Sequence, residues 1–295
     1  MKSRLILVVL VLCLSTPPAF ADVLVLVHGY LGSGTSWAES GVLDRLQRRG
    51  YQHAGEYSFS PQGILYRPTA AEQASKPVIT LNLPSQAPVV IQADWLAAYL
   101  HRIHATYPDQ DIQLAAHSAG GVVARMMLVR HGKMKVKRLI TIASPHLGTG
   151  RAIQALDATD NSGMFGFVKS WLVRRKTGDA LYATLHHSRG VLLDLAPPAP
   201  GNMLFWLNQQ PHPDIGYTSI MRIGTVYMPG DQWVPPMSQD MNQVPALAGR
   251  SQTYSMAQGH LLGPADGELI ANLLTEQPRT KAKNSAPTKD NPGVD

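Results

Sequence analysis

Ser118 is the residue from which the chemistry of this sequence can be built. It follows the apolar segment 111–116, which has strand character, and a segment of helical character runs from Gly121 to Arg130. A strand that passes through a tight turn directly into a helix projects the side chain of the turn residue away from the sheet. Small neighbours let the strand and the helix approach each other, and the sequence here is Ala116-His117-Ser118-Ala119-Gly120. We therefore predict that Ser118 is a nucleophile. The usual pattern around such a serine is Gly-x-Ser-x-Gly, and this sequence differs from it in having Ala116 in place of the first glycine.

A serine hydroxyl becomes reactive when a histidine accepts its proton and a carboxylate fixes the tautomer of that histidine. Asp231 lies in a polar loop after the strand-like segment 223–227, and His260 follows the strand-like segment 253–257. The spacing between the two residues leaves room for one helix and one strand. We predict that His260 is the general base and that Asp231 is its carboxylate. The alternatives for the carboxylate are Asp214 and Asp240.

The other histidines fall into two groups. His28 and His117 lie inside the motifs and are expected to shape the loops of the site. Seven further histidines are expected at the surface or in a lid: His53, His101, His104, His131, His186, His187 and His212.

Two backbone N–H groups are needed to hold the oxyanion of an acyl-transfer intermediate. One is the amide of Ala119, directly after the nucleophile. The other is expected from Tyr30, in the glycine-rich loop that follows the aliphatic segment 23–27. Gly29 and Gly32 allow this loop to fold back towards Ser118, because glycine has no Cβ to collide.

The apolar periodicity alternates between strand and helix along most of the chain. Such alternation predicts an α/β fold, a mostly parallel central sheet with helices on both faces. The expected helices cover 36–49, 90–107, 121–130 and 264–275. The expected strands cover 23–27, 111–116, 137–143, 219–227 and 252–257. Within residues 51–90, both 51–59 and 78–83 are candidate strands, and the second is favoured as part of the sheet.

These motifs together resemble the α/β-hydrolase superfamily, and within it bacterial triacylglycerol lipases and related carboxylesterases. The resemblance extends from about residue 23 to residue 274 and rests on these segments: Leu26-Val27-His28-Gly29-Tyr30-Leu31-Gly32, Ala115 to Gly121, Ala143-Ser144-Pro145-His146-Leu147-Gly148-Thr149, Gly230 to Pro235, and Gly259-His260. It implies hydrolysis of an acyl ester through an acyl-enzyme, with a lid over the acyl pocket. An amidase, a thioesterase or a lipid deacylase would use the same triad, and a non-catalytic binding protein on this fold is a further alternative.

The strand and helix alternation stops between about residues 147 and 213. We expect residues 150–215 to form a lid or cap insertion, in which apolar residues either contact an acyl chain or only pack the cap. They include Met164, Phe165, Phe167, Trp171, Leu172, Phe205 and Trp206. Some relatives hold structural calcium near the triad. Asp266 follows His260 without a partner pattern, so no metal and no cofactor are expected.

The N-terminal residues resemble a cleavable signal peptide spanning residues 1–21. Lys2 and Arg4 precede an apolar run at 5–14, and Ala19-Phe20-Ala21 fits the small-x-small cleavage rule. The run is too short for a membrane anchor. We expect a secreted or periplasmic protein with a hydrolase domain at 22–277 and a disordered tail at 278–295. Cys13, the only cysteine, leaves with the signal peptide, which excludes a thiol nucleophile.

Charge adds little to the expected partners. The formal net charge of +6 falls to +4 without Lys2 and Arg4, and the excess is thinly spread. This favours weak attraction to anionic surfaces and transient contact with a lipid interface, and it argues against a nucleic-acid groove. A surface-interaction role for the basic tail is a third reading. The expected partner is a small ester or lipid substrate, and the sequence does not indicate an oligomeric state.

Overall fold

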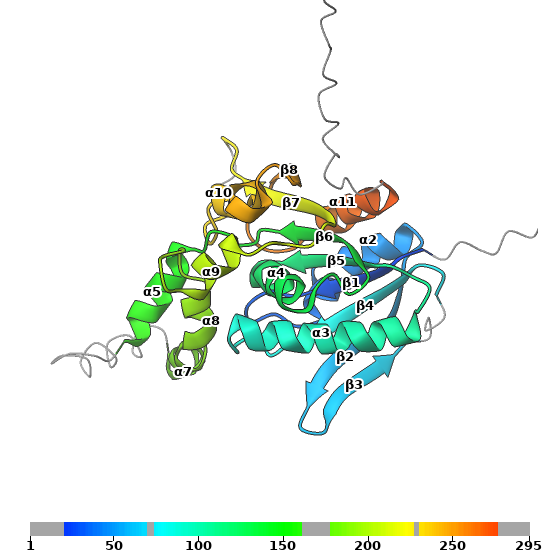
Figure 1. Ribbon diagram of the computed structural model, residues 1–295, viewed down its shortest axis with the longest axis horizontal. Coiled ribbons are helices and arrows are strands. Elements are labelled where there is room, and N and C mark those ends of the chain that lie inside the picture. The colour runs from blue at the N-terminus through cyan, green and yellow to red at the C-terminus, as the bar shows by residue number, and fades with distance from the viewer. Residues whose placement is uncertain (1–20, 70–73, 161–177, 227–229, 277–295) are drawn as a thin grey trace, which may run out of the picture.

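The computed structural model describes residues 21–69, 74–160, 178–226 and 230–276 (Figure 1). Within these residues, eight strands form one sheet in the order β3-β2-β4-β1-β5-β6-β7-β8. β2 and β3 are antiparallel, and all other neighbouring strands are parallel. The predicted, mostly parallel sheet is confirmed. The strands are β1 (Val23–Val27), β2 (Gln52–Ser60), β3 (Gly63–Pro68), β4 (Pro77–Asn82), β5 (Ile112–His117), β6 (Val136–Ile142), β7 (Gly216–Ile223) and β8 (Ser251–Ala257).

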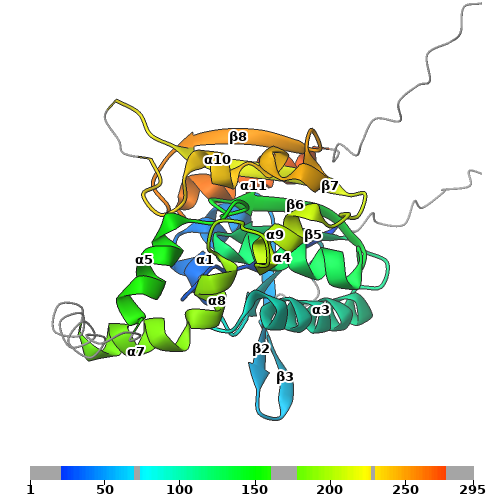
Figure 2. The same ribbon diagram turned by 60° about the vertical axis from the view of Figure 1, so that its left-hand side comes forward.

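Helices cover both faces of the sheet, as Figures 1 and 2 show. They are α1 (Ser36–Glu39), α2 (Val42–Arg48), α3 (Val89–Thr106), α4 (Ala119–His131) and α11 (Pro264–Thr275). The fully buried strand β1 explains why both faces need a cover. Its residues alternate between a cluster with α3 and α4, which contains Val25, and a cluster with α1, α2 and α11, which contains Leu24. Each such buried side chain contributes about 1.5–3 kcal/mol relative to exposure.

The largest differences between the predicted and observed elements occur in the first helix and in the strand before Asp231. The helix expected at 36–49 is divided into α1 and α2, because Gly41 adopts a left-handed conformation with φ 77°. The strand expected at 219–227 ends at Ile223 instead. After Ile223 the chain turns, and Gly230 packs back against the end of the strand. A Cβ on Gly230 would lie 2.9 Å from the Ile223 carbonyl carbon.

Residues 51–90 contribute more to the sheet than the sequence indicated. Both candidate segments are strands, β2 and β4, and β3 pairs with β2 as a hairpin that projects from the sheet (Figure 2). The face of this hairpin towards α3 is aromatic. The rings of Tyr57 and Tyr66 stack with centroids 4.5 Å apart, and Phe59 lies against Trp95 at 5.8 Å. This packing stabilises a hairpin whose outer edge has no further strand among the described residues.

The described residues between β6 and β7 form the helices α5 (Gly150–Thr159), α7 (Asp179–His187), α8 (Arg189–Asp194) and α9 (Met203–Gln209). Of these, α5, α7 and α8 project from one end of the sheet and α9 packs against the core (Figure 2). The helix α10 (Pro236–Gln239) and the 3₁₀ turns η1 (Met241–Gln243) and η2 (Pro245–Leu247) follow β7. Residues 1–20 of the predicted signal peptide, the predicted tail at 278–295 and the apolar residues from Met164 to Leu172 lie outside the described residues.

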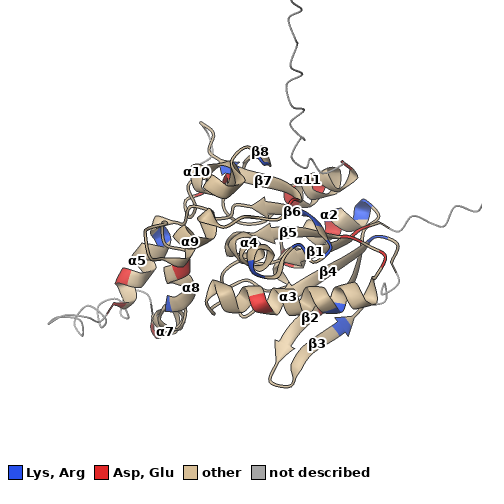
Figure 3. Ribbon diagram, in the orientation of Figure 1, with Lys and Arg blue, Asp and Glu red and all other residues tan. Residues whose placement is uncertain are grey.

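Charged side chains of both signs are interspersed over the helices and strands (Figure 3). Exposed ion pairs, such as Arg48 with Asp44 at 2.7 Å, are typical of this surface and each contribute little to stability. Among the described helices, none is both long enough and apolar enough to cross a bilayer.

Candidate active site

Ser118 lies at the junction of β5 and α4 in a strained conformation, with φ 51° and ψ −129°. A non-glycine residue with positive φ costs of order 1–3 kcal/mol, which the surrounding structure must offset. The close approach of the neighbouring elements explains the small residues after it. A Cβ on Gly120 would overlap the carbonyl oxygen of His28, and one on Gly121 would overlap the side chain of Ser144. The tight turn predicted at Ser118 is therefore present.

Three polar side chains meet at the carboxyl ends of β5, β7 and β8. The Nε2 atom of His260 lies 2.9 Å from Ser118 Oγ, and its Nδ1 atom lies 2.7 Å from Asp231 Oδ2. Because Nδ1–H of His260 donates its hydrogen bond to Asp231, the lone pair of Nε2 is left free to accept the proton of the Ser118 hydroxyl. The structure thus brings together all three residues that the sequence singled out, and it does not bring Asp214 or Asp240 to His260.

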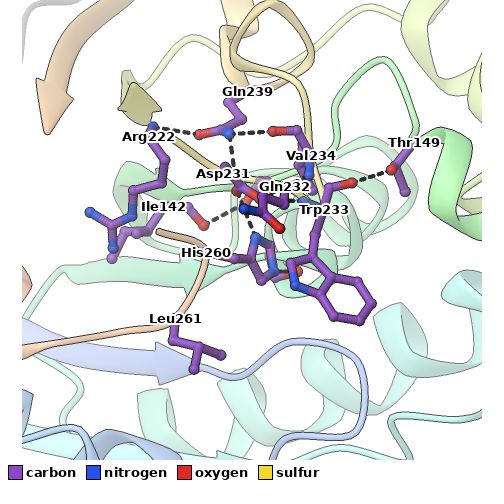
Figure 4. Close-up of polar contacts among 12 residues, drawn as sticks. Ile142, Thr149, Arg222, Asp231, Gln232, Trp233, Val234, Gln239, His260 and Leu261 are labelled. Atoms are coloured by element: carbon purple, nitrogen blue, oxygen red, sulfur yellow. Dashed lines mark hydrogen bonds and ion pairs between the residues drawn. The ribbon is translucent and has the colours of Figure 1, made fainter. Parts of the chain in front are cut away.

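Asp231 is held by more than the histidine (Figure 4). Its Oδ1 atom accepts the backbone N–H groups of Trp233, at 2.7 Å, and Val234, at 2.9 Å. Burial raises the pKa of Asp231, but hydrogen bonds from His260 and from these two backbone amides outweigh it and lower the pKa overall. The carboxylate is therefore ionised at neutral pH, in the form that can stabilise an imidazolium.

Gln239 is a supporting residue that the sequence did not reveal. It is fully buried, and its Nε2 donates to Asp231 Oδ2 at 3.1 Å and to the Val234 carbonyl at 2.7 Å. Its Oε1 accepts the backbone N–H of Arg222 on β7 at 2.7 Å (Figure 4). The loop that carries Asp231 is therefore tied to the sheet. No local pattern signals this role, because it depends on two segments that meet only in the fold.

The loop that carries His260 is anchored by Asp266. Both carboxylate oxygens of Asp266 lie 2.7 Å from Arg222 Nη2, and Oδ2 also accepts the N–H of Gly263 at 2.9 Å. Asp266 and Arg222 are completely buried. The side chain of Asp266 thus serves an internal ion pair. Among the residues that the structure describes, no three His, Cys, Asp or Glu side chains form a possible metal site.

Tyr30 and Ala119, the expected oxyanion donors, both lie near Ser118: Ala119 follows it in the chain, and Tyr30 lines the same cavity. Ala119 begins α4, and the loop before Tyr30 touches the serine, since a Cβ on Gly29 would lie 2.8 Å from Ser118 Cβ. Among the described residues, neither backbone N–H has a hydrogen-bond acceptor. His28 stabilises the loop that contains Tyr30. Its Nδ1–H donates to the Gly29 carbonyl oxygen, and its Nε2 accepts the backbone N–H of Leu83, each at 2.9 Å.

A cavity of about 380 Å³ opens over Ser118 and His260. One wall is apolar and comes from the insertion, and it includes Ala152 and Ala155 of α5, Leu185 of α7 and Leu192 of α8. The opening is bordered by three exposed apolar side chains, Leu31, Trp233 and Leu261, which are 47%, 60% and 75% exposed. The insertion therefore contributes directly to the space above the serine.

A buried polar network connects α4 to the Ser-Pro-His segment. Arg125 is completely buried and donates to His212 Nε2 at 3.2 Å and to Asn208 Oδ1 at 2.9 Å, and it lies 3.4 Å from His146 Nδ1. Burial lowers the pKa of Arg125 to about 9 and that of His212 to about 3. A surface position for His212 is wrong, because the residue is buried and accepts a hydrogen bond from the buried guanidinium of Arg125.

The chain belongs to the α/β-hydrolase family. The family model for the alpha/beta hydrolase fold matches residues 22–258, which is most of the chain. The order of the parallel strands, the helices on both faces and the strained turn at Ser118 agree with this membership. No curated protein sequence is significantly similar to the chain.

Solved structures share the fold at low sequence identity. The product of gene lin2722 from Listeria innocua is 17% identical with a TM-score of 0.59, covering 88% of this chain and 96% of its own. The mature Bacillus licheniformis lipase BlEst2 is 18% identical with a TM-score of 0.56, covering 88% and 94%. The RedJ thioesterase of Streptomyces coelicolor is 17% identical with a TM-score of 0.51, covering 88% of each chain. At these identities the likeness establishes the fold alone.

Proposed function

We propose that this protein is a serine hydrolase that cleaves carboxylic esters through an acyl-enzyme. The observation that carries the proposal is the continuous chain of contacts from Asp231 through His260 to Ser118, at 2.7 and 2.9 Å, with the serine facing a cavity. A histidine between a buried carboxylate and a hydroxyl is the arrangement that activates serine for acyl transfer.

In the proposed reaction, His260 takes the proton of Ser118 as Oγ attacks the ester carbonyl. The backbone N–H groups of Tyr30 and Ala119 hold the oxyanion, and Asp231 stabilises the imidazolium. His260 then gives its proton to the leaving alcohol oxygen as the ester bond breaks. Water is activated by His260 in the same way, attacks the acyl-enzyme and releases the acid, which returns Ser118 to its starting state.

The cavity supports an acyl chain of modest length. Its volume of about 380 Å³ is near the lower end of the range of small-molecule pockets, and its lining is largely aliphatic. We propose that residues 150–215 act as the cap of this acyl site. The exposed rim of Leu31, Trp233 and Leu261 also favours transient contact with a lipid surface. Comparison of rates below and above the solubility limit of one ester would test that contact.

The proposal is tested with a fluorophosphonate probe and a p-nitrophenyl butyrate assay. We expect the probe to label the wild type at Ser118, and Ser118→Ala to lower turnover on the order of 10⁶-fold. Ser255→Ala, at an exposed position of β8, serves as the matched control and should retain full activity. Near wild-type turnover by Ser118→Ala would overturn the assignment. Faster cleavage of matched thioesters or amides would keep the triad and change the substrate class.

We also propose that residues 1–21 are removed on export. Strand β1 begins at Val23, and the side chain of Asp22 already accepts a hydrogen bond from Gln113 Nε2 at 2.7 Å. A chain beginning at Asp22 therefore retains the whole sheet. N-terminal sequencing of the protein recovered from the periplasm or the medium of a bacterial host should read Asp-Val-Leu-Val. Full-length protein retained in the cytosol would contradict export.

A further inference from the structure

Arg151 gives the cavity above Ser118 an uneven charge. Among the described residues that line this cavity, Arg151 is the one with a permanent charge, and no carboxylate accompanies it. It lies in the first turn of α5, two residues after the N-cap Thr149. A cation is disfavoured at a helix N-terminus, because the helix dipole is positive there. The stability of α5 therefore does not explain an arginine at this position.

The guanidinium is oriented by its neighbours but not neutralised by them. Its Nε–H donates to the carbonyl of Gln232 at 3.1 Å, and Nη1 donates to Gln154 Oε1 at 3.0 Å. It also stacks on Trp233, with Cζ 5.7 Å from the ring centroid. A guanidinium has five N–H donors, and the others have no acceptor among the described residues. No Asp or Glu of the described chain lies within ion-pair distance of it.

The position of Trp233 relates this cation to the reacting atoms. The rings of Trp233 and His260 are 6.5 Å apart, and Figure 4 shows the indole beside the imidazole. Arg151 lies against the same indole and lines the same cavity as Ser118, so an ester bound at Ser118 shares this cavity with the guanidinium. A planar guanidinium with free N–H groups matches a carboxylate or phosphate, which it binds through two parallel hydrogen bonds.

We propose that Arg151 selects esters that carry an anionic group close to the scissile bond. The inference rests on the proposed ester hydrolysis and names the substrate class for the same site. The substrate then has an apolar part against α5, α7 and α8 and a carboxylate, phosphate or sulfate against Arg151. The alternative is a purely structural role, in which Arg151 only ties α5 to the loop that carries Asp231.

The test compares esters that differ only in charge. One pair places the charge on the alcohol: 4-carboxyphenyl butanoate and its neutral analogue 4-carbamoylphenyl butanoate. The other pair places the charge on the acid: the monophenyl ester of adipic acid, and the same phenyl ester with the free carboxyl group replaced by a carboxamide. We expect wild-type kcat/KM to be higher for the anionic member of at least one pair. Arg151→Gln should lower kcat/KM for that ester roughly tenfold or more while changing the neutral member less than threefold.

Two further variants make the result specific. Arg151→Lys keeps the positive charge but loses the paired N–H groups of the guanidinium, so it should recover part of the preference for the anionic ester. Arg102→Gln, at an exposed position of α3, should leave that preference unchanged. Equal losses for both members of each pair, or no change in the ratio, would overturn the proposal in favour of the structural role. Failure of the proposed function itself would look different: no wild-type hydrolysis of the neutral esters and no fluorophosphonate adduct.

Discussion

The Nε2 atom of His117 lies 2.9 Å from the backbone carbonyl oxygen of His260. Since Nε2–H must donate in this contact, the imidazole of His117 is the neutral Nε2–H tautomer. Burial and the nearby His260 lower the pKa of His117 to about 3, so it stays neutral over the working range of pH. The residue before the proposed nucleophile therefore holds the backbone of the proposed base, and the two loops are fixed relative to each other.

The His117 contact predicts a positioning role that kinetics can separate from substrate binding. His117→Ala should lower kcat about 10-fold with little change in KM, because only the alignment of His260 with Ser118 is loosened. His117→Gln retains an N–H donor of similar reach and should recover most of kcat. Steady-state assays on one neutral ester would measure both effects. A rise in KM at constant kcat would instead assign His117 to substrate binding.

The buried network around Arg125 predicts loss of stability in acid. Burial and the charge of Arg125 hold the pKa of His212 at about 3, well below its value in the unfolded chain, about 6.5. The unfolded state therefore binds a proton that the folded state does not, and stability falls as the pH decreases from about 6.5 towards 3. This single residue accounts for on the order of 2 kcal/mol of stability lost between pH 7 and pH 5.

His212→Gln tests that prediction, because a glutamine oxygen can still accept the hydrogen bond from Arg125 and does not titrate. Urea unfolding at pH 7 and pH 5 should show a smaller acid loss for this variant than for the wild type. His101→Gln, at an exposed position on α3, is the matched control and should follow the wild type. Parallel curves for His212→Gln and wild type would refute the role of His212.

Sequence patterns predicted those parts of the molecule that depend on local structure. The unbroken aliphatic run of β1, the helix at 264–275 and the small residues around Ser118 each follow from a steric or periodic demand within a few residues. The sequence pattern does not predict the hairpin β2–β3, because its polar and aromatic residues become a packed face only against α3. Gln239, Arg151 and the burial of His212 were missed for the same reason, since their partners are remote in sequence.

Gly120, two residues after the proposed nucleophile, predicts a steric limit on the turn. In Gly120→Ala, the new methyl group would overlap the His28 carbonyl and lie 3.0 Å from the Val27 carbonyl, both on rigid backbone. Overpacking of this kind costs about 1–3 kcal/mol or more. Gly150→Ala is the contrasting variant, because nothing lies within 4 Å of the added Cβ and α5 favours alanine. Thermal unfolding should show a clearly lower Tm for Gly120→Ala and no lower Tm for Gly150→Ala.

The apolar wall formed by α5 predicts that acyl-chain preference can be altered at Ala155. This residue lines the cavity together with Leu185 and Leu192, so Ala155→Phe should fill the space that a longer chain would occupy. Each methylene excluded from an apolar site costs about 0.8 kcal/mol, or roughly fourfold in kcat/KM. We expect the variant to hydrolyse p-nitrophenyl decanoate at least 10-fold less efficiently, with p-nitrophenyl acetate nearly unaffected.

The matched control for Ala155→Phe is Ile153→Phe, on an exposed position of the same helix that does not line the cavity. It adds an aromatic ring to α5 without entering the site, so its chain-length profile should match the wild type. Equal losses on acetate and decanoate in Ala155→Phe would show that the acyl chain lies elsewhere. A selective loss on decanoate would instead assign this wall of the insertion to the acyl group, because steric exclusion acts only on the methylenes that reach it.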